Sequence, residues 1–335
     1  MSKLQIRNSL LLLLTATVWG MGFVAQSVGM EYIGVFTFTS IRSWIAGIVL
    51  IPCIWFLNKK LNADNKIWEE GMGAGNTIEI SIKTEENQIP QNLKMLEEER
   101  KNLILGGVCC GIFLAIASSL QQIGVQYTTV GKAGFITAFY IIIVPILGIF
   151  FKKKCTPAVW VGVVFALAGL YCLCITDGEA GEVLIQKGDF YVFLCALAFS
   201  GHILCIDYFS EKADGVKMAC IQFFVCGIIT AVPMFLLEEP SLAAIITAWK
   251  PVLYAGAISS GVGYTLQIVG QKGMNPTVAS LILSLESVVS VIGGMVILGQ
   301  MMSARELLGC ALMFVAIVLA QLPEKKEYKS IYRKK

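Results

Sequence analysis

The sequence predicts an all-α polytopic membrane protein in which ten transmembrane helices form two inverted five-helix repeats. The first indication is composition, because hydrophobic residues make up 56% of the 335-residue chain and charged residues only 15%. These values lie far from those of soluble domains. The second is that the apolar residues gather in ten runs, each close to the roughly 20 residues that cross a ~30 Å hydrocarbon core. The third is that the second half of the chain repeats the first.

The ten apolar runs are separated by short polar or charged segments. They cover residues 9–29, 34–57, 103–124, 131–151, 157–176, 189–209, 217–237, 252–270, 277–298 and 305–322. The first run follows Lys3 and Arg7, but no small-x-small cleavage site comes after it. We therefore interpret it as a membrane span rather than a removable signal peptide.

Lysine and arginine are distributed unevenly between the two sides of such a membrane protein. With the N-terminus in the cytoplasm, 21 of the 26 basic residues fall on the cytoplasmic side. Without the long segment 58–101, whose charges weigh little, the ratio is 14 to 4, and Arg42 lies within a span. The positive-inside rule then predicts both termini in the cytoplasm, for a multi-pass protein of the cell (inner or plasma) membrane.

The internal repeat is clearest where residues 133–140 match residues 279–286, which places Tyr140 opposite Glu286. Further matches occur at offsets of 180, 146 and 147: Trp19 with Phe199, Ile41 with Ile221, Arg42 with Gln222, Gly47 with Gly227, Gln121 with Gln267, Gly124 with Gly270, and Gly162 with Gly309. The drop in offset locates an insertion within residues 58–101 of the first half.

Five spans per half is an odd number, so the second half must enter the membrane from the opposite face. Inverted repeats are the architecture of secondary transporters, whose substrate site lies near the membrane midplane between the halves. We divide the chain accordingly into a first repeat at 1–180, a second repeat at 181–323 and a basic cytoplasmic tail at 324–335.

The insert at 58–101 holds nine acidic and seven basic residues and interrupts the apolar pattern completely. Thr77 to Lys83 alternates as a strand does, and Leu93 to Lys101 is typical of a short charged helix that leads into the third span. A single strand has nothing to pair with, so we expect a largely flexible cytoplasmic insert. A regulatory or partner-binding role is the alternative.

Five segments also resemble the EamA-type family of the drug/metabolite transporter superfamily. They read WGMGFV, FTSIRSWIAGIVLIP, TVGKAGFITAFYIIIVPILGIFFKKK, NPTVASLILSLES and LLGCALMFVAIVLAQL. The resemblance covers nearly the whole chain apart from 58–101 and the tail, and it implies ten helices in two inverted repeats around a central cavity that moves metabolites, often outward. Two positions depart from the family pattern: Ser287 stands where a proline usually follows the acid, and Gln300 follows Gly299 where glutamate is usual.

Glu286 is the acid near the middle of the run 277–298, where a carboxylate costs ~2.5–3.5 kcal/mol on insertion scales. We expect it to face the protein interior. Three states are open to it: ionised and paired with Arg42, protonated and neutral, or cycling between the two.

We predict that a central cavity is lined by polar and aromatic side chains from several spans. They are Trp19, Arg42, Tyr140, His202, Tyr264 and Glu286. In the run 252–270, Ser260, Tyr264, Gln267 and Gln271 share one helical stripe, and Pro145 is a candidate for a kink in the run 131–151.

Three of these residues have an alternative interpretation. Packing or interface anchoring competes with substrate stacking for Trp19, and snorkelling to the outer interface competes with a substrate carboxylate or Glu286 for Arg42. His202, the single histidine, is either a satisfied packing residue or a proton carrier.

The function that follows is a secondary transporter, and a probable exporter on the family resemblance, of small metabolites or amino-acid-like or drug-like solutes. A membrane-embedded enzyme acting on a lipid-linked substrate and a non-transporting sensor are the rivals. The chain has no HExxH or GxSxG motif, no phosphate-binding loop, and eleven scattered cysteines without metal-like spacing. We therefore expect no enzyme activity, cofactor, metal or nucleic-acid partner; the expected partners are a small-molecule substrate and the lipid bilayer, with proton coupling as an open alternative.

Overall fold

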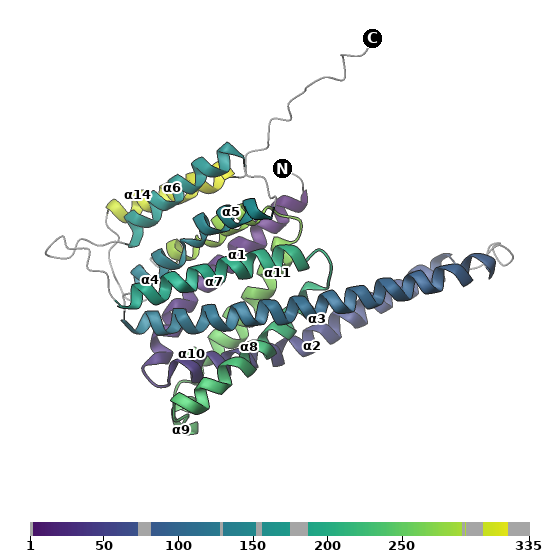
Figure 1. The fold of residues 1–335 in the computed structure, drawn as a ribbon, viewed down its shortest axis with the longest axis horizontal. Helices are drawn as coiled ribbons and strands as arrows, with labels where there is room; N and C mark the ends of the chain where they lie inside the picture. The colour runs from purple at the N-terminus through teal and green to yellow at the C-terminus, as the bar shows by residue number, and fades with distance from the viewer. Residues whose placement is uncertain are drawn as a thin grey trace, which may run out of the picture.

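The structure is a computed structural model that describes residues 3–72, 82–127, 130–151, 156–174, 187–289, 292 and 304–320; for residues 60–72, 82–93, 130–132, 135, 170, 173–174, 306 and 320 it describes the backbone alone. The helices of this described part are arranged as a bundle (Figure 1). They are α1 (Lys3–Met30), α2 (Val35–Met72), α3 (Ile82–Tyr127), α4 (Val130–Thr137), α5 (Tyr140–Phe150), α6 (Pro157–Cys174), α7 (Lys187–Phe209), α8 (Gly215–Leu237), α9 (Leu242–Thr247), α10 (Trp249–Leu253), the π-helix η1 (Tyr254–Tyr264), α11 (Thr265–Gln271), α12 (Pro276–Leu283) and α14 (Ala304–Ala320).

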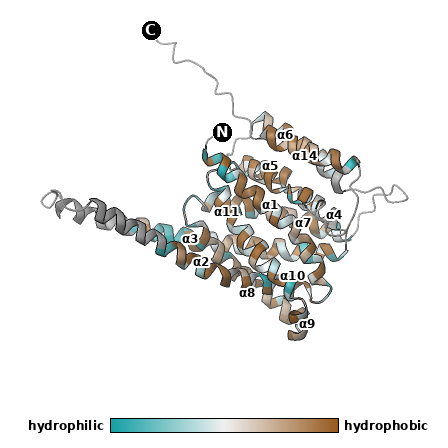
Figure 2. Cartoon of the chain, turned by 180° about the vertical axis from the view of Figure 1, so that it is seen from behind, coloured by the Kyte–Doolittle hydropathy of each residue, from teal (hydrophilic) through white to brown (hydrophobic). Residues whose placement is uncertain are grey.

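In the part of the chain that the structure describes, six stretches of helix are long and apolar enough to cross a membrane: Lys3–Met30, Val35–Lys59, Lys94–Tyr127, Lys187–Phe209, Gly215–Leu237 and Trp249–Gln271. Shorter apolar helices occupy the other four predicted spans, at Tyr140–Phe150, Pro157–Gly169, Pro276–Val289 and Leu307–Leu319. Large aliphatic and aromatic side chains are exposed along most of the helices, which Figure 2 colours largely as hydrophobic, while serine, threonine and glutamine side chains are among those buried within the bundle. An apolar exterior with polar groups buried inside is the arrangement expected when lipid is the solvent.

Where helices α2 and α8 cross, an aromatic ring of each helix packs against a glycine of the other. The Trp44 ring lies against Gly227 and the Phe224 ring against Gly47, where an added Cβ would stand 3.1 and 3.0 Å from the nearest ring atom. The two rings meet edge to face with their centroids 5.5 Å apart. These four residues are two pairs at the repeat offset of 180.

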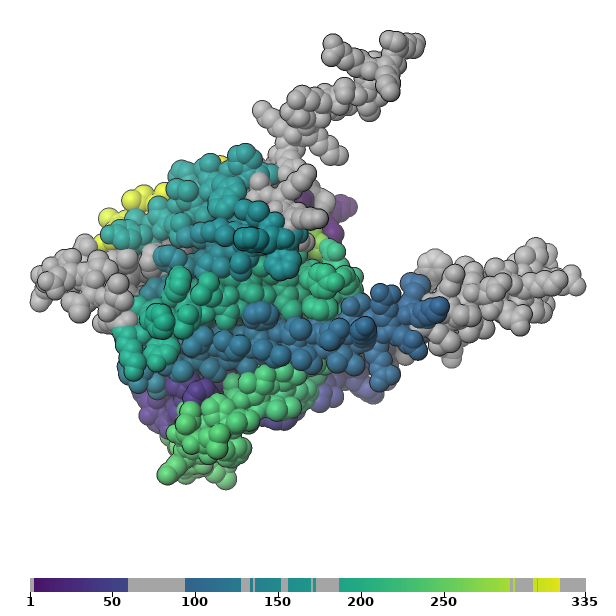
Figure 3. Space-filling model, in the orientation of Figure 1, coloured from purple at the N-terminus to yellow at the C-terminus, as the bar shows by residue number. Residues whose placement is uncertain are grey.

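Helix α3 lies between α7 and α8 on the face drawn in Figure 3, while α6 and α14 lie side by side at one edge of the bundle (Figure 1). The small residues of α3 allow the close approach, since Gly107 faces Ile221 and Gly111 faces Val225. A Cβ at either glycine would stand within 2.6 Å of the facing side chain.

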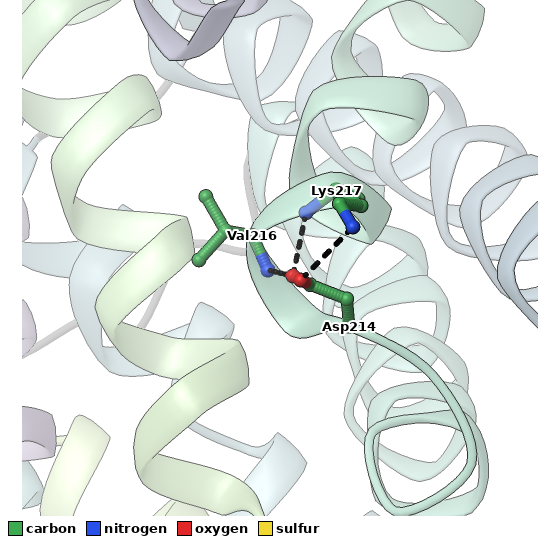
Figure 4. A network of polar contacts seen from close by, with 3 residues as sticks. All are labelled: Asp214, Val216 and Lys217. Carbon is green, nitrogen blue, oxygen red and sulfur yellow. Dashed lines mark hydrogen bonds and ion pairs between the residues drawn. The ribbon is translucent and has the colours of Figure 1, made fainter. Parts of the chain in front are cut away.

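Two helix starts are capped by acids, in two different ways. Asp214 accepts hydrogen bonds from the backbone N–H groups of Val216 and Lys217 at 2.9 and 3.1 Å and pairs with the Lys217 ammonium at 3.6 Å (Figure 4). At the equivalent position before α2 the chain has Gly34, and Glu238 from the end of α8 accepts from the backbone there instead.

The insert at 58–101 is helical where it is described, unlike the flexible segment that we expected. Helix α2 continues to Met72 and α3 begins at Ile82. Each extends a spanning helix through a segment that contains good helix formers such as Lys, Glu and Leu, and no new helix has to be nucleated. The short helix predicted for Leu93 to Lys101 is confirmed as part of α3, whereas 73–81 and the tail 324–335 lie outside the described residues.

Candidate functional site

A cavity lies in the middle of the bundle, where α1, α2, α3, α4, α5, α7, η1, α11 and the chain around α12 meet. Its described lining consists of Trp19, Phe23, Gln26, Arg42, Gln121, Thr137, Tyr140, Phe199, Ile203, Ser259, Tyr264, Gln267, Leu283 and Glu286. Five of the six residues predicted from the sequence are therefore brought together in one space. His202 is the exception.

Ten of these lining residues form pairs separated by the repeat offsets. The pairs are Trp19 with Phe199, Phe23 with Ile203, Gln121 with Gln267, Thr137 with Leu283, and Tyr140 with Glu286. Each half of the chain thus contributes equivalent positions to the same cavity, with different side chains at most of them.

Tyr140 and Glu286, the pair at the centre of the repeat, contact each other directly. The Tyr140 hydroxyl donates a hydrogen bond to Glu286 Oε1 at 3.3 Å. Glu286 is 5% exposed and Tyr140 3%. The acid is therefore partnered by a neutral hydroxyl in this conformation.

The helix is interrupted immediately before each member of that pair. Turns at Ala138–Phe139 and Ser284–Leu285 replace regular helix, and the backbone N–H groups of Phe139 and Leu285 donate three residues back, at 3.1 and 3.2 Å. The interruption before Glu286 forms although Ser287 stands where the family has proline. In the first half the break precedes Tyr140, and Pro145, our candidate for a kink, lies inside α5 instead.

Arg42 is held inside the bundle by α2, with 5% of its surface exposed. Its guanidinium carbon lies 5.8 Å from the centre of the Phe38 ring, within cation–π range. Within the described part of the chain the guanidinium makes no ion pair and no hydrogen bond. The pairing with Glu286 that we considered from the sequence is therefore absent from this conformation.

Trp19 and Tyr264 form an aromatic wall against η1. Their ring centroids are 4.5 Å apart, and the indole N–H of Trp19 donates to the Ser259 carbonyl at 3.0 Å. Gly263 makes room for the indole, since a Cβ there would stand 2.6 Å from Trp19 Nε1. The wider turn of η1 places Ser259 and Tyr264, five residues apart, on the cavity, where the helical spacing had predicted Ser260.

His202 lies behind this wall. Its ring is 5.8 Å from the Tyr264 ring and its Nε2 is 3.1 Å from Gln222 Oε1, while its Nδ1 has no partner among the described residues. It is fully buried. The structure thus favours the packing interpretation of His202 over a place on the cavity surface.

Buried amides complete the lining: Gln267 lies on the stripe that the sequence indicated, whereas Gln26 and Gln121 were not among the lining residues that we predicted. Gln121 donates to Thr137 Oγ1 at 3.4 Å, while the Oε1 atoms of Gln26 and Gln267 have no hydrogen-bond partner in the described part of the molecule. The repeat could have identified Gln121 and Gln267, since they match each other at the offset of 146. Free acceptor atoms of this kind suit a ligand that brings N–H or O–H donors.

The cavity is nearly closed in this conformation. It leaves about 30 Å³ for the centres of water-sized molecules, room for about two waters, whereas pockets that hold organic ligands measure ~300–1,000 Å³. A metabolite therefore needs a wider state of the same bundle. The described residues contain no cluster of three histidine, cysteine or acidic side chains around which a metal could bind.

Comparison with known proteins gives consistent matches over almost the whole chain. A model of the EamA-like transporter family matches residues 7–175 and 186–322. An uncharacterized transporter of Archaeoglobus fulgidus is 23% identical over 312 residues, which cover 93% of this chain and 84% of the relative. The uncharacterized transporter YwfM of Bacillus subtilis is 23% identical over 324 residues, 95% of either chain. A solved structure, described only as the crystal structure of a protein, shares the fold with a TM-score of 0.68 at 15% identity, covering 94% of this chain and 96% of its own.

Proposed function

The chain belongs to the EamA-like transporter family and is a multi-pass membrane transporter, and on that premise we propose that it exports small amphiphilic solutes across the cytoplasmic membrane by alternating access. In this proposal ten spans form two inverted five-helix repeats, with both termini in the cytoplasm. The substrate binds in the central cavity, which opens first to one side of the membrane and then to the other.

Reciprocal contacts support the inverted repeats. A two-fold axis brings residue i against the mate of j and residue j against the mate of i. The contacts of Trp44 with Gly227 and of Phe224 with Gly47 follow this rule. The two helix interruptions also support the inverted repeats, because they occur at matched positions in the two halves.

The observation that carries the proposal is the central cavity built from repeat-related pairs. Secondary transporters with inverted repeats bind their substrate at the interface of the repeats, beside broken helices near the bilayer midplane. Here the pair Tyr140 and Glu286, each following a helix interruption, lies on the cavity together with an aromatic wall. The nearly closed volume is consistent with a state between the two open ones.

Flux measurements distinguish this proposal from a membrane-embedded enzyme and from a sensor. Metabolite profiles of cells with and without the protein identify solutes to label, and uptake is then measured in inside-out and right-side-out vesicles. If the protein exports a solute, the labelled solute should accumulate in inside-out vesicles.

A matched pair of tryptophan substitutions provides the control. Leu283→Trp fills the cavity and should abolish flux, whereas Leu253→Trp, at a position 48% exposed on the outside of the bundle, should preserve it. Equal flux in the two variants would exclude the cavity as the route, and chemical conversion of the solute without flux would favour the enzyme.

A further inference from the structure

The cavity contains a permanent positive charge without a direct counter-charge in the described part of the chain. The Arg42 side chain is 5% exposed and faces the Phe38 ring at 5.8 Å. A guanidinium stays ionised in proteins, and a buried cation without a hydrogen-bonded anion is costly in a membrane interior. An anionic group that enters the cavity can therefore make a direct contact with Arg42 that no described side chain makes in this conformation.

The acid on the same cavity is directed to a neutral partner. Glu286 accepts a hydrogen bond from the Tyr140 hydroxyl at 3.3 Å and does not touch Arg42. The described titratable or charged groups that face it are Tyr140 from α5, Cys195 from α7, Tyr264 from η1 and Arg42 from α2. Arg42 and Glu286 both act electrostatically on Tyr264 and Cys195, so the two charges share one space without forming a pair.

The remaining surface of the cavity suits the body of an organic ion. Trp19, Phe199 and Tyr264 offer aromatic rings, which favour a flat or apolar group. The free Oε1 atoms of Gln26 and Gln267 accept hydrogen bonds from donors on such a body.

We propose that the cavity binds a small organic anion together with one proton, the anionic group pairing with Arg42 while the proton resides on Glu286. This inference rests on the transport function proposed above and names its substrate class. A carboxylate and the monoanion of a phosphate monoester share the required chemistry, because each carries one negative charge and can accept two parallel hydrogen bonds from a guanidinium.

The proton follows from the charges in the cavity. With Glu286 ionised, Arg42 and Glu286 cancel, and a bound monoanion leaves the cavity with a net negative charge. A proton on Glu286 returns the loaded cavity to neutrality. Because net charge is costly in a low-dielectric interior, anion and proton stabilise each other and cross the membrane together.

Binding to the full-length protein in lipid nanodiscs tests this inference. The probes are benzoate, phenyl phosphate, the neutral benzamide and the cationic benzylammonium. We expect one or both anions to bind more tightly than benzamide, and the difference between benzoate and phenyl phosphate separates carboxylate from phosphate. Calorimetry in weakly buffered solution should detect uptake of about one proton per anion where Glu286 starts ionised, and affinity should fall by up to about tenfold per pH unit as pH rises.

Two substitutions assign the two charges. Arg42→Gln should weaken anion binding by about 30-fold or more and leave benzamide unaffected, with the exposed Arg100→Gln as its matched control. Glu286→Gln should retain anion binding and lose both its pH dependence and the proton uptake, with the exposed Glu239→Gln as control.

Equal binding of benzamide or benzylammonium and the anions overturns the inference, as does anion binding that takes up no proton at any pH, or a lack of binding by both anions. Proton uptake is measured on the unaltered protein, so a variant that fails to fold does not decide the outcome. If solute flux is measured in vesicles but neither anion binds, this inference is wrong and the proposed transport stands. If an anion binds but no flux is measured, the proposed transport is wrong.

Discussion

The two halves of the chain place the same backbone positions around the cavity but equip them with different chemistry. Trp19 and Tyr140 of the first half correspond to Phe199 and Glu286 of the second, whereas Gln222, the counterpart of Arg42, is not among the lining residues. The first half thus supplies a cation and the second an acid. A scaffold with two-fold similarity can therefore carry a site without symmetry, because backbone geometry is repeated while individual side chains are replaced.

The surroundings of Arg42 and Gln222 show how such a difference is accommodated. Gln222 Oε1 is 3.1 Å from the ring of His202, so both polar groups have a partner within the second half. The first half has Gly22 at the position equivalent to His202, and a glycine offers Arg42 no side-chain partner. The cation is left facing the cavity instead.

Giving Gln222 the side chain of its counterpart Arg42, or the reverse, should have the largest effect on the free energy of unfolding. Gln222→Arg introduces a cation beside His202 without an acid and should lower the free energy of unfolding by about 3 kcal/mol. Arg42→Gln removes an unpaired buried charge and should leave that free energy unchanged or raise it. Unfolding of the purified variants in bicelles measures both, and equal losses from the two substitutions would contradict the asymmetry.

The two glycines at the crossing of α2 and α8 should behave alike. Gly47→Leu and Gly227→Leu each force a side chain into the facing ring and should lower the free energy of unfolding by about 2 kcal/mol. Phe224→Ala should rescue the first variant and Trp44→Ala the second. Tolerance of one leucine but not the other, in the same unfolding assay, would break the reciprocity.

Removal of the insert should have the smallest effect on insertion and flux, since the second half has no equivalent segment. Replacing residues 62–98 by a short Gly/Ser linker should leave membrane insertion and flux intact, because the cavity-lining residues all lie outside that range. Vesicle flux against the full-length chain checks this. A variant that inserts normally but has lost flux would assign the insert a role in transport.

Much of the cavity could be predicted from sequence because the repeat fixes which spans meet. The repeat matches Tyr140 with Glu286, and these two residues share a hydrogen bond in the structure. Polar and aromatic residues at helical spacing in apolar spans indicate the face that points inward, and the structure has Trp19 and Arg42 on the cavity.

Other features depend on backbone choices that the sequence does not signal. The helix interruption before Glu286 forms without a proline. The π-helical turn of η1 places Ser259 on the cavity, where α-helical spacing had predicted Ser260. The contact with Gln222 holds His202 away from the cavity surface, and this contact depends on how α7 lies relative to α8. Composition favoured a solvated segment outside the predicted helix at Leu93 to Lys101, so the extension of α2 to Met72 and the start of α3 at Ile82 were not predicted.

The inverted relation of the two halves is tested most directly by labelling two equivalent residues. Tyr32 and Lys212 are 180 positions apart, and both are exposed in the turn that precedes the second helix of their repeat. In a cysteine-free background, an impermeant maleimide should label Tyr32→Cys only from outside the cell and Lys212→Cys only from the cytoplasmic side, in inside-out vesicles. Labelling of both positions from the same side of the membrane would contradict the inverted repeats and the transport cavity built on them.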